Sequence, residues 1–215
     1  MEIDHIFIRV KRGAPEAKAL RQFGLTEGSP NTHTGQGTAN RRFFFDNAFI
    51  ELLWLEDAEA ASSELTRPTL LLERLTPGAD EVSPFGVCFR PSAQEAKSAP
   101  FPSWQYRPVY LPPGLAVDVA SAPPSEPMWF FLAFGSRPDA APALKRQPLQ
   151  AAAGLGAISA LRIVAPHTGD SAGVAAMAGI ALEEGAEHLL EISFDDAASG
   201  RSYDFRPRLP LVFKW

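Results

Sequence analysis

His5 and Glu51 are the two residues whose chemistry stands out from their surroundings. His5 lies in a β-branched and aromatic run over residues 2–10, and Glu51 lies inside the apolar segment Phe-Ile-Glu-Leu-Leu-Trp. A buried carboxylate is costly unless it is paired, hydrogen-bonded or bound to a cation. An imidazole nitrogen and a carboxylate oxygen together suit zinc, nickel, manganese or ferrous iron. The residues alone favour the alternative, in which Glu51 faces solvent on an edge strand and His5 is a hydrogen-bonded core histidine.

A glycine-rich segment supplies further polar groups. Residues 32–40 read Thr-His-Thr-Gly-Gln-Gly-Thr-Ala-Asn. Their glycines let the backbone approach a bound group, and His33 and Asn40 offer hydrogen bonds. A phosphate-binding loop would lie directly before the first turn of a helix, whereas a strand pattern follows this segment. A nucleotide site is therefore not favoured. The alternative is an ordinary surface loop.

Two arginines follow this segment. If residues 39–46 form an alternating strand, one of Arg41 and Arg42 faces inward, where a desolvated guanidinium suits an anionic oxygen. The alternative is an exposed arginine lying along the aromatic run 43–45.

Aromatic side chains further along the chain can line an apolar pocket with a few polar groups, although core packing is their commoner role. The side chains that we expect to bind a small molecule are Trp54, Tyr106, Arg107, Trp129 and Phe131.

Alternation and turn residues predict short strands with few helices, as the 20 prolines also indicate. The expected elements of the first part are a strand at 2–10, a helix from Pro15 to Gly24, a loop at 25–38, and strands at 39–46 and 48–55 that flank a turn at Asp46-Asn47. The expected elements of the second part are strands at 84–90, 104–110, 115–120 and 128–134, with a short helical segment at 94–97. The expected elements of the third part are a strand at 158–164, a helix from Ser171, and strands at 189–194 and 209–213.

This order indicates an α+β protein whose strand-rich units pair so that their sheets curve around a shared cavity, with helices outside. We expect one domain over residues 1–134, made of modules 1–56 and 82–134. A linker over 135–156 leads to a strand–helix–strand unit over 157–215 that packs on the same fold.

Composition limits the class of protein, its location and the kinds of partner that it is expected to bind. Hydrophobic residues make up 46% and charged residues 21% of the 215 residues, which indicates a globular protein and not a disordered one. A net charge of -5 without a basic run disfavours nucleic acid. No apolar stretch approaches the length of a membrane span, and the polar N-terminus does not resemble a signal peptide, so a cytoplasmic location is expected. The single cysteine, Cys88, excludes an internal disulfide and is interpreted as a small buried hydrophobe. Open curved sheets leave edges that a second copy can cover, so a homodimer is one expectation.

The segments Ile3-Asp4-His5-Ile6-Phe7-Ile8, Phe23-Gly24-Leu25, the glycine-rich 33–40 and Phe49-Ile-Glu51 together resemble the vicinal oxygen chelate superfamily. The resemblance is to its glyoxalase-like branch, of the glyoxalase, bleomycin-resistance and dioxygenase type. It implies paired βαβββ modules whose mixed sheet forms a cup, with divalent-metal ligands on the first and last strands of the modules. Carried over by position, His5 matches the first-strand ligand and Glu51 the fourth-strand ligand.

The chain departs from the family pattern in its later modules. The strands at 84–90 and 128–134 contain neither histidine nor carboxylate, and Ala160 stands where the third unit would carry a histidine. The metal site is therefore expected to be incomplete unless His33, water or substrate completes the ligand shell.

Two functions follow from the resemblance. The first is a metal-dependent lyase, isomerase or dioxygenase acting on a small oxygen-rich molecule, with an ion at His5 and Glu51 as Lewis acid, or with Glu51 as base and Arg42 and Asn40 orienting the substrate. The second is a non-catalytic protein that binds a small molecule in the same cup without metal. A third interpretation is a structural domain whose cavity is filled by side chains.

Overall fold

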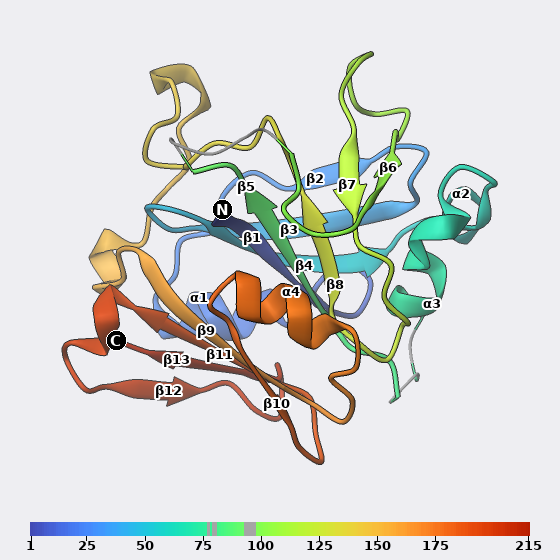
Figure 1. Ribbon diagram of the computed structural model, residues 1–215. Coiled ribbons are helices and arrows are strands. Elements are labelled where there is room, and N and C mark those ends of the chain that lie inside the picture. Colours follow the sequence, from blue (N-terminus) through green and yellow to red (C-terminus); the bar gives the residue numbers. More distant parts are fainter. Residues whose placement is uncertain (77, 79–80, 93–97) are drawn as a thin grey trace.

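The computed structural model describes residues 1–76, 78, 81–92 and 98–215, and its strands form two sheets (Figure 1). The larger sheet has eight strands in the order β2-β3-β4-β1-β5-β8-β7-β6. Its strands are β1 (Glu2–Arg9), β2 (Asn31–His33), β3 (Thr38–Phe44), β4 (Phe49–Leu55), β5 (Phe85–Arg90), β6 (Trp104–Tyr106), β7 (Val117–Val119) and β8 (Met128–Phe131).

The smaller sheet has five strands in the order β10-β9-β11-β13-β12. Its strands are β9 (Ile158–Ala165), β10 (Ala181–Glu184), β11 (Leu189–Phe194), β12 (Ser202–Asp204) and β13 (Leu211–Lys214). The helices are α1 (Ala17–Phe23), α2 (Ala58–Ser62), α3 (Leu71–Leu75) and α4 (Ser171–Met177), with short 3-10 turns at Arg67–Thr69, Ala143–Lys145, Ala151–Ala153 and Asp195–Ala197. Among the described residues, none of these helices has the length and hydropathy of a transmembrane span.

The first module follows the predicted order of elements. Helix α1 ends at Gly24, whose φ of 116° lets its N–H reach the carbonyls of the last turn, and β3 and β4 flank the predicted turn at Asp46-Asn47. The predicted loop 25–38 contains a short strand, β2, that pairs antiparallel with β3. Because β2 is polar and only three residues long, it carries no apolar alternation by which to recognise it.

Two modules meet along β1 and β5, which pair antiparallel, while β1 pairs parallel with β4 and β5 parallel with β8. This arrangement curls the eight strands into a half-barrel, which confirms the α+β class and the cup-like mixed sheet. Strands β6 and β7 are shorter than predicted, since prolines lie on both sides of them, and β8 ends at Phe131, three residues earlier than predicted. The helical segment predicted at 94–97 involves residues 93–97, which lie outside the described residues.

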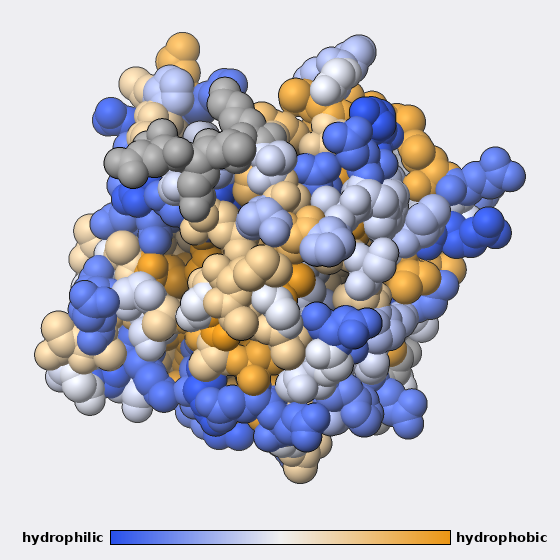
Figure 2. Space-filling view, viewed as in Figure 1, coloured by the Kyte–Doolittle hydropathy of each residue, from blue (hydrophilic) through white to orange (hydrophobic). Residues whose placement is uncertain are grey.

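The outer face of the large sheet packs against α1 and the C-terminal unit in one continuous apolar core. Trp129 of β8 donates its indole N–H to Ser171 Oγ of α4 at 2.7 Å, and the buried Glu126 accepts the Ser171 N–H at 2.8 Å. Figure 1 shows α4 beside β8 and β9, and Figure 2 shows hydrophobic colouring gathered over α4 in the middle of this face. The inner face of the large sheet is thereby left to form a site.

The C-terminal unit shares only its β–α–β opening with the first module. Strand β9 and helix α4 lie where they were predicted, but β9 pairs antiparallel with β11, whereas β1 pairs parallel with β4. The prediction lacked β10 and β12, because Ala181–Glu184 is short, half charged and mostly exposed, and Ser202–Asp204 is short and exposed.

The inner face is closed at one end by α3. Leu71 and Leu75 of α3 pack with Phe7, Leu53 and Val119 of the sheet. The Phe7 ring lies over Gly86 of β5, where a Cβ atom would stand 2.1 Å from the ring. Glycine at this position lets the aromatic ring cross the neighbouring strand.

His188 lies in a crevice between the two sheets, among Arg9, Pro84, Pro166 and Pro210. Both of its ring nitrogens are buried without a hydrogen-bond partner in the part of the chain that the structure describes. Burial first, and then the charges of Arg9 and His167, lower the pKa of His188 to about 4 from an ordinary value of 6.5. The folded protein therefore keeps this ring neutral.

We predict that protonation of His188 weakens the fold in acid. Because its pKa is lower folded than unfolded, its stabilising effect is complete above pH 6.5 and is lost as the pH falls toward 4. The expected loss is roughly 1–2 kcal/mol, since water screens the partly exposed ring. Urea unfolding at pH 7 and pH 4.5 should show a smaller pH effect in His188→Gln than in the wild type. The control is the exposed His167→Gln, which removes only the smallest of the three causes and should keep a pH effect close to that of the wild type. Equal pH effects in the wild type and His188→Gln would contradict the prediction.

Candidate functional site

The inner face of the large sheet surrounds an open cavity of about 310 Å³, within the usual range for small-molecule pockets. The cavity is not filled by side chains. Its polar lining comes mainly from β1 to β4: Asp4, His5, Asn31, His33, Asn40, Arg42 and Glu51. Its apolar lining includes Phe7, Leu53, Val117, Val119, Met128, Phe130 and Leu132.

His5 and Glu51 both face this cavity from neighbouring strands. In the parallel pairing of β1 and β4, His5 lies opposite Phe49 and Glu51 opposite Phe7, so the two polar side chains are offset by two positions on one face. His5 Nε2 and Glu51 Oε2 lie 3.6 Å apart. Both residues are buried, with exposed fractions of 8% and 4%. The His5 ring stacks on Phe49 at 4.5 Å, which fixes its plane.

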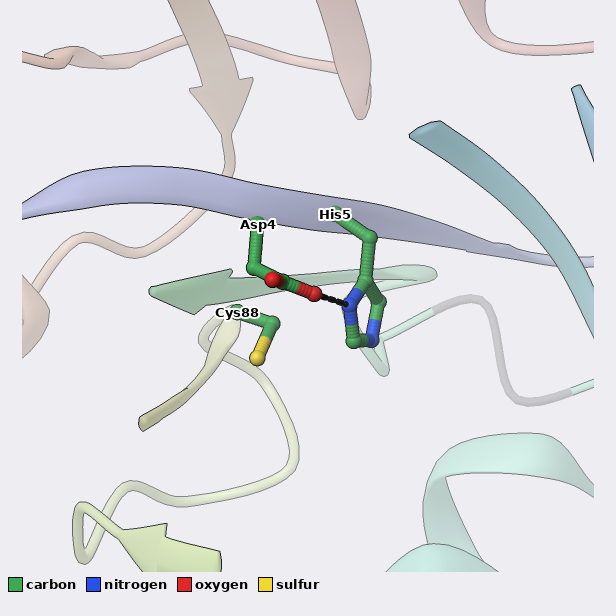
Figure 3. Close-up of side chains that lie close together, drawn as sticks. All are labelled: Asp4, His5 and Cys88. Carbon is green, nitrogen blue, oxygen red and sulfur yellow. Dashed lines mark hydrogen bonds and ion pairs between the residues drawn. The ribbon is translucent and has the colours of Figure 1, made fainter. Parts of the chain in front are cut away.

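Asp4 forms a hydrogen bond with the second ring nitrogen of His5, Nδ1. His5 Nδ1 lies 2.7 Å from Asp4 Oδ1 (Figure 3). Asp4 Oδ2 lies 3.7 Å from the guanidinium of the buried Arg90. Strict alternation along β1 would place Asp4 on the face opposite His5. An irregularity in the β1–β5 pairing between Ile3 and His5 instead places Asp4 at the cavity. Sequence reasoning missed Asp4, although an acid beside His5 in an apolar strand was a visible signal.

Asn40 of β3 orients Glu51. Its amide Nδ2 donates to Glu51 Oε1, and its Oδ1 accepts the backbone N–H of Asn31 at 2.8 Å. Both carboxylate oxygens of Glu51 are therefore placed, one against Asn40 and the other facing His5. The hydrogen bond from β3 and the imidazole from β1 together offset part of the cost of burying the acid.

His33 and two tyrosines form the wall next to the glycine-rich turn. His33 Nδ1 lies 2.8 Å from Thr38 Oγ1, and burial is the main cause that lowers the His33 pKa. Tyr110 OH donates to Gln36 Oε1 at 3.3 Å, and Tyr106 OH lies 3.1 Å from Thr66 Oγ1. Burial raises the pKa of both tyrosines, so this wall presents neutral imidazole and phenol groups.

Arg42 is the inward-facing member of the arginine pair. Its Nε donates to the Ser29 carbonyl at 2.8 Å, and its guanidinium lies over the rings of Phe44 and Phe49 at 5.2 and 5.9 Å. Burial lowers the pKa of Arg42. Arg41, one residue earlier, points to the other face and forms an ion pair with Glu27.

Four of the expected binding side chains lie away from this cavity, while Tyr106 lines it. Trp54, Trp129 and Phe131 are buried in the outer-face core, and Arg107 is exposed. Strand alternation is the reason: on β8, Met128 and Phe130 face the cavity, so their neighbours face the core. Phe130 of β8 and Tyr110 of the turn after β6 line the cavity instead; strand register was the signal that could have selected Phe130, whereas Tyr110 lies on no strand.

The second module has weaker metal-ligand donors than His5 and Glu51 at the positions that correspond to these two residues. Cys88 lies opposite His5 across β1 and β5 and opposite Phe130 across β5 and β8, so it corresponds to His5. Phe130 corresponds in the same way to Phe49, which lies opposite His5. Leu132, two residues after Phe130, therefore corresponds to Glu51, two residues after Phe49. Asp4, His5 and Cys88 bring one oxygen, nitrogen and sulfur atom within 4.8 Å of one another and could hold a metal ion (Figure 3). Burial raises the pKa of the Cys88 thiol well above its ordinary value.

A curled sheet of two joined modules around an imidazole and a carboxylate is the architecture of the vicinal oxygen chelate superfamily. A family model described as a glyoxalase-like domain matches residues 3–168, and the chain belongs to this family. The match extends beyond residue 134 through β9.

A crystal structure of a hypothetical protein from Staphylococcus aureus has a similar fold, with a TM-score of 0.57 and 14% sequence identity over 99% of this chain and 98% of that chain. At this identity the likeness shows the fold alone. A search of the curated proteins returned no match.

We predict that Asp4 stabilises the fold through its buried partners. Asp4→Ala leaves Arg90 with one charged partner fewer and His5 Nδ1 without its acceptor, at an expected cost of about 3 kcal/mol. The matched control is Asp139→Ala, which breaks the exposed pair with Arg137 and should cost less than about 1 kcal/mol. Urea unfolding at pH 7 measures both values. Equal losses in the two variants would contradict this role for Asp4.

Proposed function

We propose that this protein is an enzyme that binds a small, largely apolar molecule with adjacent oxygen atoms and isomerises or cleaves it by proton transfer. The observation that carries the proposal is the buried pair of His5 and Glu51, 3.6 Å apart in a 310 Å³ cavity. Catalytic sites typically contain ionisable groups that are buried, oriented by hydrogen bonds to neighbouring side chains, and exposed to a cavity.

Glu51 is the proposed base. Its carboxylate takes a proton from the carbon next to a substrate carbonyl, and the electron pair of the broken C–H bond moves toward the carbonyl oxygen. Asn40 holds the carboxylate in place, and His5, held by Asp4, lies where it can receive or return the proton. If the hydroxyl on the deprotonated carbon passes its proton to the oxyanion and the abstracted proton adds to the former carbonyl carbon, the product is an isomer. If a group instead leaves with its bonding electrons from the carbon beyond the deprotonated one, the product is that of a lyase.

Neutral donors lie around the position where negative charge would develop. Tyr106, Tyr110 and His33 line the same cavity as Glu51, and burial keeps the two phenols protonated. Hydrogen bonds from such groups stabilise an oxyanion more effectively in a site that excludes water. Proton transfer therefore needs only groups that this cavity presents.

A divalent ion such as zinc, nickel, manganese or iron also suits the first module. His5 Nε2 and Glu51 Oε2 are close enough for both to bind one ion at the usual distance of about 2.1 Å. Asp4 on Nδ1 supplies the carboxylate support that metal-binding histidines commonly have. When bound, the ion would act as a Lewis acid on adjacent substrate oxygens. With Cys88 and Leu132 in the matching positions, the second module contributes at most a thiol.

The apolar character of the second module favours one other function, binding without chemistry. Leu132 stands at the position that corresponds to Glu51, and Phe130, Met128 and Val119 continue the apolar wall. Phe130, and not Trp129, is the aromatic side chain that such a binding protein would use.

Proton transfer is tested with 2-hydroxyacetophenone, which has an apolar body and adjacent oxygens. In D2O, proton NMR should show loss of the CH2 signal faster with the protein than in buffer, and Glu51→Gln should slow this exchange about 100-fold. Glu56→Gln, which changes an acid further along the same chain segment, should exchange like the wild type. If the wild type binds the ketone in calorimetry without accelerating exchange, the protein is a binding protein and the catalytic proposal is wrong.

Metal binding is tested by calorimetric titration of zinc, nickel and manganese ions into protein stripped with a chelator. We expect about one equivalent to bind, with His5→Ala and Glu51→Gln each weakening the affinity at least about tenfold. Cys88→Ser distinguishes the two donor sets, because only the group of Asp4, His5 and Cys88 uses the thiol. No uptake by the wild type, or uptake that both variants leave unchanged, would contradict a metal at this pair.

A further inference from the structure

Arg42 is a cavity-lining cation without an acidic partner in the described part of the chain. Its Nε donates to the Ser29 carbonyl, and among the residues that the structure describes no ion pair or hydrogen bond occupies its two terminal amino groups. Two other arginines of the large sheet do have acidic partners. Arg41 forms an ion pair with Glu27, and Arg90 forms ion pairs with Glu2 and Asp4. Glu51, directly opposite on β4, acts on Arg42 through its charge but forms no ion pair with it among the described residues, so the terminal N–H groups of Arg42 remain available to a ligand.

The guanidinium is also held in place. It lies over the rings of Phe44 and Phe49, while Phe49 stacks on His5. A half-buried guanidinium fixed by aromatic rings and one carbonyl loses little freedom when it binds a planar anion with its remaining N–H groups. Its lowered pKa reflects the burial that a counterion would offset.

The opposite wall of the cavity is apolar. Leu53, Val117, Val119, Met128 and Phe130 line it, and no charged side chain joins them from β7 or β8 among the described residues. A ligand that fills the cavity therefore has an anionic end near Arg42 and an apolar body toward β7 and β8.

We propose that the ligand of this cavity is a carboxylic acid with an aliphatic or aromatic body, bound through its carboxylate by Arg42. The substrate class rests on the proposed function and deepens it. Arg42 lies directly opposite Glu51 in the pairing of β3 and β4, so both side chains are on one face. A carboxylate at Arg42 brings the adjacent carbons toward Glu51, and a 2-oxo or 2-hydroxy acid also supplies adjacent oxygens. The substrate class is a 2-oxo or 2-hydroxy acid with an apolar side chain.

The test compares two molecules of nearly equal shape, 3-phenylpropanoate and 3-phenylpropanamide, by calorimetry at low salt. We expect the acid to bind the wild type at least about tenfold more tightly than the amide, the scale of a charge-assisted hydrogen bond. Arg42→Gln should remove this preference, and Arg42→Lys should keep part of it. Arg41→Gln is the matched control, because it changes the neighbouring arginine on the other face and should retain the preference.

Equal binding of acid and amide to the wild type overturns the proposal, as does a preference that persists in Arg42→Gln. Failure of both molecules to bind at millimolar concentration also overturns it. Because the wild-type comparison needs no variant, the test stands even if Arg42→Gln does not fold. If the acid binds through Arg42 but the ketone shows no proton exchange, only the catalytic proposal is wrong. If the neutral ketone exchanges its protons but the acid is not preferred over the amide, only the present inference is wrong.

Discussion

The burial of Glu51 is the constraint on which the site depends. A carboxylate with only 4% exposure inside an apolar strand would destabilise the fold unless other strands supplied polar partners. Asn40 supplies one from β3 and His5 faces it from β1, so the central strand β4 is positioned between two polar neighbours. The same contacts that make the acid tolerable also hold it at the cavity, where it is available for chemistry.

The polar network extends from both sides of Glu51, and on the β3 side it passes through Asn40 to the backbone N–H of Asn31. From Glu51 it passes through His5 and Asp4 to Arg90, whose guanidinium also bonds the Ile3 carbonyl and Glu2. The second module contributes Cys88 and an apolar wall in place of a second imidazole and carboxylate. The first module therefore carries the imidazole and the carboxylate, and the second adds the two tyrosines and an apolar wall that shape the space in which they act.

The sequence was enough to predict the cup and the first module, because its apolar alternation, the turn at Asp46-Asn47 and the glycine that ends α1 are local signals. It was not enough for Asp4, whose position follows from an irregular pairing with β5, a non-local partner. The choice between Phe130 and Trp129 likewise depends on which face of β8 is covered by α4, which composition does not show. Short polar strands such as β2 and β12 were missed, since tertiary pairing alone makes them strands.

The central claim is that His5 and Glu51 interact within one cavity. A double-mutant cycle measures this directly, with the unfolding free energies of the wild type, His5→Ala, Glu51→Gln and the double variant compared at pH 7. We expect a coupling energy of about 1 kcal/mol or more, because each side chain is buried against the other. Effects of the two substitutions that add within about 0.3 kcal/mol would contradict the account.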